Sequence, residues 1–151
     1  MRRARRKKAF TLLEILLVVG ILALLAAFVV PNLMQRGRQA KIKIAETAIG
    51  GNGPLCQALD QYMFDVGQYP DTDEGLKALY EIPSSIDEEE EGEIWKGPYL
   101  KGDPEALRDP WNQEYNYKCP GDVNEDGFDL WSNGPDTKEG TDDDIKNWRE
   151  K

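Results

Sequence analysis

The chain has 151 residues, a formal net charge of −9, two cysteines and no histidine. The lack of histidine excludes zinc sites with histidine ligands and nucleophilic catalysis that needs an imidazole base. The acidic balance argues against nucleic-acid binding, which needs a basic surface. The sequence therefore favours a structural or binding protein over an enzyme, with a membrane-anchored enzyme that uses acidic residues as the disfavoured class.

The N-terminal region joins a basic block to a long apolar run. Six of the first eight residues are arginine or lysine, and residues 10–30 are apolar apart from Thr11, Glu14 and Gly20. As a helix, this run is roughly 31 Å long, which is enough to cross a bilayer core. The basic block is expected to stay on the cytoplasmic side, so the chain after Pro31 faces outward.

Glu14 is unusual because a carboxylate inside a membrane helix is costly unless it is paired. Cleavage between Ala9 and Phe10 would remove the basic block and create an α-amino group four residues from Glu14. The same amine on a neighbouring chain could neutralise Glu14, and repetition of that contact would build a filament. A secretory signal peptide is the weaker interpretation, because the apolar run is too long and lacks an Ala-x-Ala cleavage site. A plain anchor with an accidental Glu14 is the other alternative.

The rest of the chain predicts short elements of both kinds. The helix should continue through 32–49, break at the glycine-rich segment 50–54 and resume over 55–66. A short helix is expected over 74–80 and a solvated acidic loop over 84–93. Strands are expected over 114–118 and 128–132, and residues 145–148 should close the fold.

Acidic residues near the C-terminus form the first candidate metal site. Asp136 precedes a run of three aspartates, and Gly134 and Gly140 allow the chain to bend here. Calcium takes six to eight oxygen ligands from carboxylates and from the carbonyls of bent loops. A loop that folds back on itself could place Asp136, Asp143 and Asp144 around one ion, and an uncoordinated acidic loop is the alternative.

A second acidic segment matches the first half of an EF-hand loop. Asp122, Asn124 and Asp126 alternate and are followed by Gly127 at the sixth position. The twelfth position is Asn133 instead of glutamate, and no helix is predicted beside it. This segment is a second candidate metal loop, and the alternative is a hairpin turn, because short loops rich in Asp, Asn and Gly are often only turns.

The two cysteines leave a further question open. In an oxidising compartment Cys56 and Cys119 could form one disulfide that closes a long loop. Two separate buried thiols are the alternative.

Two sets of motifs carry a resemblance to a known family. Ala9-Phe10-Thr11-Leu12-Leu13-Glu14, followed by the apolar run and Pro31, resembles the type III signal of type IV pilins and pseudopilins. Blocks over residues 67–148 resemble the major pseudopilin of type II secretion, the general secretion pathway protein G family. These blocks are Gly67-Gln68-Tyr69-Pro70, Glu74-Gly75-Leu76, Gly97-Pro98-Tyr99-Leu100, Asp109-Pro110-Trp111, Phe128-Asp129-Leu130-Trp131-Ser132, Gly134-Pro135-Asp136 and Asp143-Asp144-Ile145 with Asn147-Trp148. The chain departs from the family in Ala9, where glycine is usual, and in the glycine-rich break at 50–54.

The resemblance implies a processing step and a set of metal ligands. A prepilin peptidase would cut between Ala9 and Phe10 and methylate the new amine. The related pseudopilins hold calcium in the C-terminal loop. Their side-chain ligands match Asp136, Asp143 and Asp144, and the positions that donate backbone carbonyls match Asn133 and Lys138.

The resemblance also implies a fold and a role. The expected fold is α+β and pilin-like: a long N-terminal helix, membrane-spanning in its first half, packed on a small antiparallel sheet with a C-terminal calcium-binding loop. Residues 1–9 would be a cleaved leader, 10–31 the transmembrane and assembly helix, and 32–151 a periplasmic domain.

In that role, the chain would polymerise from the bacterial inner membrane into a pseudopilus that drives export of folded proteins. Its expected partners are itself, minor pseudopilins, inner-membrane secretion assembly proteins and the prepilin peptidase. A subunit of a type IV pilus or competence filament is the alternative.

Overall fold

The computed structural model describes residues 10–86, 92–102 and 107–148. Its contacts divide the chain into two compact units, Met1–Arg38 and Gln39–Lys151. The elements in chain order are helices α1 (Leu12–Ile49) and α2 (Pro54–Val66), the 3-10 helix η1 (Gly75–Leu79), strands β1 (Asn116–Lys118) and β2 (Asp129–Ser132), the 3-10 turn η3 (Gly134–Asp136) and strand β3 (Ile145–Lys146). The predicted α+β class, with one long N-terminal helix, is confirmed.

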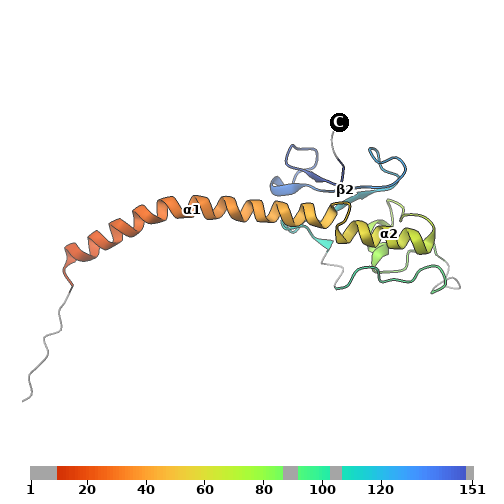
Figure 1. Cartoon of the computed structure of the whole chain (residues 1–151), viewed down its shortest axis with the longest axis horizontal. Coiled ribbons are helices and arrows are strands. Elements are labelled where there is room, and N and C mark those ends of the chain that lie inside the picture. Colours follow the sequence, from red (N-terminus) through yellow and green to blue (C-terminus); the bar gives the residue numbers. More distant parts are fainter. Residues whose placement is uncertain (1–9, 87–91, 103–106, 149–151) are drawn as a thin grey trace, which may run out of the picture. The chain divides into compact units, whose positions relative to one another are not determined.

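Helix α1 is one continuous helix with Pro31 inside it (Figure 1). Proline lacks a backbone N–H, so one helical hydrogen bond is missing at this point. The side-chain amide of the next residue, Asn32, donates to the Phe28 carbonyl at 3.0 Å. Every residue from Phe10 to Lys41 is exposed, including the entire apolar run. This helix is the one long and apolar enough to cross a membrane, judged by length and composition, among the residues described.

The predicted break between the first two helices is confirmed, because α1 ends at Ile49 and α2 begins at Pro54. A Cβ atom on Gly53 would lie 2.3 Å from the Thr47 carbonyl oxygen and 2.4 Å from that of Ala48. No other residue fits so close to backbone. Pro54 follows as the first residue of α2, where its missing N–H costs nothing because that group has no helical partner.

The sheet is antiparallel with the strand order β1-β2-β3. Trp131 in the central strand pairs with Asn116 on one side and with Lys146 on the other. The strands are shorter than predicted but lie inside the predicted ranges. Leu130 on β2 is completely buried, so the sheet presents one face to the core.

The core of the Gln39–Lys151 unit includes fully buried aliphatic side chains from four elements. Ile49 ends α1, Leu59 lies in α2, Leu79 ends η1 and Leu130 lies in β2, and all four are fully buried. Burying such a side chain stabilises a fold by about 1.5–3 kcal/mol. The C-terminal end of α1 is therefore part of the domain core, which confirms the predicted packing of the helix against the domain that carries the sheet.

Candidate functional site

The start of α1 carries the first candidate site. Ala9 lies outside the described residues, so the predicted cleavage point between Ala9 and Phe10 stays a prediction. Phe10 is 75% exposed. Glu14 is exposed, and its carboxylate makes no hydrogen bond or ion pair with any residue that the structure describes.

Thr11 has a local role that the sequence analysis missed. Its hydroxyl oxygen accepts a hydrogen bond from the Glu14 backbone N–H at 3.2 Å. The spacing Thr-x-x-Glu is the capping-box pattern, in which the first residue caps the helix and the fourth adds negative charge near its N-terminus. That pattern could have been recognised in the sequence. It gives Glu14 a favourable local position without giving its carboxylate a partner.

The C-terminal acidic loop, residues 133–144, is closed tightly at its base. Gly134 has φ of +64°, and a Cβ atom there would lie 2.1 Å from the Asp143 carbonyl oxygen. Thr137 is also left-handed, with φ of 59°. Glycine at position 134 therefore allows the two ends of the loop to meet.

Three oxygens in this loop surround the hydroxyl of Thr141. The Thr141 Oγ1 atom lies 2.8 Å from Asp143 Oδ1, 3.3 Å from the Lys138 carbonyl and 3.5 Å from Asp144 Oδ1. A hydroxyl can donate only one proton, so it cannot satisfy all three acceptors. Three of the five predicted ligand residues thus converge on one point.

The other two predicted ligand residues make different contacts. Asp136 Oδ1 accepts from the Lys138 backbone N–H at 2.9 Å, and the Asn133 side chain accepts from the Asn116 amide at 2.7 Å. No group of three or more acidic or cysteine side chains able to hold a metal is present in the ranges that the structure describes. The structure therefore gathers Lys138, Asp143 and Asp144 but does not gather all three carboxylates, and calcium binding stays a prediction.

A buried carboxylate stabilises the base of the acidic loop through hydrogen bonds. Asp109 is 5% exposed, and its two oxygens accept from the backbone N–H groups of Trp111 and Gln113 and from the Ser132 hydroxyl. The Ser132 hydroxyl in turn accepts from the Gly134 N–H at 3.1 Å. Asp109 therefore links its own turn to the first residues of the acidic loop. Its hydrogen bond with Ser132 joins residues 23 positions apart, and no local sequence pattern predicts it.

The second candidate metal loop is organised around Asp129. This buried carboxylate accepts from the backbone N–H groups of Asp122, Val123 and Asn124 at 2.7, 2.9 and 3.0 Å. The Asp122 carboxylate is paired with the Lys118 ammonium at 2.6 Å. These contacts order the loop in the structure, and metal binding by Asp122, Asn124 and Asp126 stays a prediction.

The cysteines are both free thiols in the structure. The Cys56 thiol donates to the Ile49 carbonyl at 3.2 Å. Burial raises the pKa of Cys56 to about 11, and the charge of Asp60 adds to this, so the thiol is protonated at neutral pH. The structure contains no Cys56–Cys119 disulfide; Cys56 is buried and Cys119 is partly exposed.

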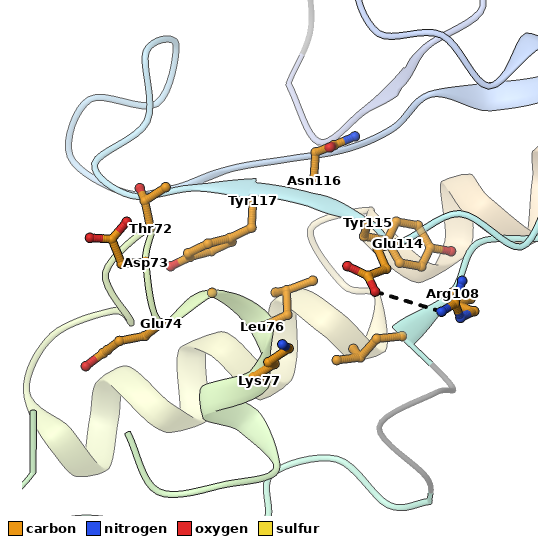
Figure 2. A pocket seen from close by; sticks show the side chains of 12 residues that line it. Thr72, Asp73, Glu74, Leu76, Lys77, Arg108, Glu114, Tyr115, Asn116 and Tyr117 are labelled. Atoms are coloured by element: carbon orange, nitrogen blue, oxygen red, sulfur yellow. Dashed lines mark ion pairs between the residues drawn. The ribbon is translucent and has the colours of Figure 1, made fainter. Parts of the chain in front are cut away.

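A surface groove of about 510 Å³ lies between η1 and β1 (Figure 2). Arg108 and Glu114 face each other at its rim, 3.9 Å apart, and both belong to an isolated β-bridge. The Tyr117 hydroxyl donates to the Pro70 carbonyl at 2.8 Å, and burial raises the pKa of Tyr117. The Tyr117 hydrogen bond therefore ties the chain before η1 to β1.

Comparison with known proteins decides the family. The protein-family model described as type II secretion system (T2SS), protein G, matches residues 32–148. A second family model, the prokaryotic N-terminal methylation motif, matches residues 4–30. The chain belongs to the type II secretion system protein G family. The two matches meet near Pro31, where the sequence analysis separated the assembly helix from the outer domain.

Individual relatives agree over nearly the whole chain. The type II secretion system core protein G of Vibrio cholerae is 42% identical over 98% of this chain and 96% of its own length. That of Pseudomonas aeruginosa is 43% identical, covering 95% and 96%. The crystal structure of the major pseudopilin of enterohaemorrhagic Escherichia coli matches with a TM-score of 0.57 and 32% identity, covering 80% of this chain and 92% of that one.

Asp129 offers a test of whether the second loop is structural. Asp129→Ala leaves three backbone N–H groups without their acceptor, and we expect a loss of about 1–3 kcal/mol in the free energy of unfolding. Chemical denaturation of the detergent-solubilised full chain measures it. The control Asp126→Ala, at an exposed carboxylate, should change stability by less than about 0.5 kcal/mol. If Asp129→Ala loses stability only in the presence of calcium, and not after the calcium is chelated, this loop is instead a metal site.

Proposed function

We propose that the apolar part of α1 serves in turn as the membrane anchor and the polymerisation element of a type II secretion pseudopilus. The chain is a structural subunit of that filament, as its family and its likeness to a solved major pseudopilin indicate. The observation that carries the proposal is the apolar run of α1, which this chain's own described residues leave uncovered. A bilayer covers that surface in the monomer, and neighbouring copies cover it in the filament.

Glu14 supplies the specific contact of the assembly. After cleavage, the α-amine of Phe10 begins the helix, and Glu14 lies four residues, or about 6 Å, further along it. A neighbouring copy displaced by that distance along the axis would bring its amine to the Glu14 carboxylate. The unpaired state of Glu14 among the described residues supports this role, because a partner must come from another molecule.

The proposed location follows from the distribution of charge and apolar residues. Residues 1–9 are a cytoplasmic leader that the prepilin peptidase removes, 10–31 cross the inner membrane once, and 32–151 form the periplasmic domain. The partners we propose are further copies, minor pseudopilins and the inner-membrane assembly proteins. The acidic domain repels the phosphates of nucleic acid, so we propose no nucleic-acid partner. The family match favours this system over a type IV pilus or competence filament.

Calcium is the ion we propose for the acidic loop. The Lys138 carbonyl and the carboxylates of Asp143 and Asp144 already converge, and hard oxygen ligands of this kind suit calcium. Asp136 and the Asn133 carbonyl would complete the protein ligands. The ion would neutralise carboxylates that repel one another and so hold the loop closed against the sheet.

Processing is the first test of this function. We expect mass spectrometry of the membrane-embedded protein to find Phe10 as the N-terminal residue, carrying one added methyl group. Ala9 is small enough for the peptidase, so the match to the methylation motif should be functional. Ala9→Gly is the control and should be processed at least as completely. If the basic block is retained, the proposal that the helix first anchors the subunit and then assembles the filament is contradicted.

Removing the Glu14 carboxylate tests the assembly contact. Glu14→Leu should insert and fold normally but reduce the amount of sheared filament by roughly tenfold or more, because the neighbouring amine is left unpaired. Glu46→Leu is the matched control, since Glu46 is an exposed carboxylate on the same helix that pairs with Lys43. If Glu14→Leu assembles as well as Glu46→Leu, no intermolecular pair depends on this residue.

Calcium removal tests the acidic loop. An ion at 100 times its dissociation constant stabilises the fold by about 2.7 kcal/mol. Chelation should therefore lower the melting temperature of the processed protein by roughly 5–10 °C. Asp143→Ala should lower it similarly and abolish the response to chelator.

The variant Asp122→Ala is the control for the choice of loop. It should keep the full response to chelator, because its carboxylate is paired with Lys118. Loss of the response in Asp122→Ala but not in Asp143→Ala would show that the ion binds in the other loop. No response in the unmodified protein would exclude both loops.

A further inference from the structure

The charges of this chain are separated along its length. Of the 28 acidic residues, only Glu14 and Glu46 precede Thr47. Four basic residues lie close together on α1 after the apolar run, and no acidic residue lies among them. We call these the basic segment: Arg36, Arg38, Lys41 and Lys43. The processed subunit thus carries a positive segment beside a strongly negative domain.

The basic segment is exposed and only partly neutralised by its own chain. All four side chains are exposed. Lys43 pairs with Glu46 at 3.1 Å, whereas Arg36 and Lys41 make no ion pair with any residue in the described ranges. At 100° per residue, Arg36 and Lys43 share one side of the helix, and Arg38 and Lys41 lie toward the other. Positive charge is therefore present on both sides of α1 along this segment.

Lipid headgroups explain only the beginning of this segment. Arg36 lies roughly 9 Å beyond Val30 along a helix, and Lys43 roughly 20 Å beyond it. The headgroup region on each side of the hydrocarbon core is only about 5–8 Å thick. Attraction between charges in solution is screened over about 8 Å. Lys41 and Lys43 therefore lie too far from the apolar run to be explained by anionic lipid.

We infer that the basic segment is a docking surface for the acidic domain of a second copy of this chain. This inference rests on the proposed filament and names the surfaces that meet in it. The domain offers exposed carboxylates without an ion-pair partner among the described residues, including Glu125, Asp126, Glu139 and Asp142. A contact between two different surfaces of the same chain can repeat from copy to copy along an open filament, whereas a contact of one surface with itself closes a dimer. Opposite charge also sets which surfaces meet and discourages domain-to-domain contact.

Zero-length cross-linking tests which groups meet. Filaments are assembled from an equal mixture of unlabelled and heavy-isotope-labelled full-length subunits. A carbodiimide then joins lysine amines to carboxylates that are in contact. We expect mixed-isotope peptides that join Lys41 or Lys43 to an aspartate or glutamate after Thr47. The pair between Lys43 and Glu46 within one chain is an internal control and gives only single-isotope peptides.

Charge reversal tests whether the contact matters. Arg36→Glu combined with Lys41→Glu should reduce filament yield by about fivefold for each reversed side chain. The loss should shrink as salt is raised, because screening weakens the repulsion. The matched control, Arg36→Lys with Lys41→Arg, keeps both charges and should assemble normally. Membrane insertion and the melting temperature should be the same in both variants.

The outcomes separate this inference from the function on which it rests. If the unmodified chain forms no filament, the proposed function and the inference both fail. If it assembles and the charge-reversed variant assembles equally well, only the inference is overturned. Single-isotope peptides alone, in filaments that do form, overturn it as well. Loss of membrane attachment in the charge-reversed variant would identify lipid as the partner and would also overturn it.

Discussion

The uncovered apolar surface of α1 is the constraint on which the rest of this structure depends. A helix that is apolar on all sides must be covered by lipid or by protein. Here the described part of the chain provides no cover between Leu12 and Met34. The subunit is therefore incomplete alone, and the domain that follows the apolar run has to be stable and able to present surfaces to other copies.

The domain that follows the apolar run meets that need with a small core and several buried polar contacts. The end of α1 enters the core through Ala45 and Ile49. Buried carboxylates then organise backbone where there is little secondary structure: Asp109 beside the acidic loop and Asp129 inside the hairpin loop. Each accepts three hydrogen bonds, which offsets the cost of burying its charge. A calcium ion in the acidic loop would extend the same principle.

Periodicity and composition predicted the elements well and the polar contacts poorly. The apolar run, the break at Gly53 and the short strands follow from local sequence, because chain length, glycine and alternation determine them. The Asp109 brace joins residues that are distant in sequence, so no local pattern reveals it. For the acidic loop, spacing suggested three carboxylates around one ion. The structure instead turns Asp136 toward the Lys138 N–H, because left-handed residues at both ends of η3 set the path of the backbone.

The most direct measurement is electron cryomicroscopy of filaments sheared from cells that express the unmodified chain. The account predicts that residues 10–34 of neighbouring copies pack together at the filament axis, with each Glu14 carboxylate within ion-pair distance of the Phe10 amine of another copy. A filament in which this part of α1 is left uncovered, or in which Glu14 faces no amine, would contradict the account.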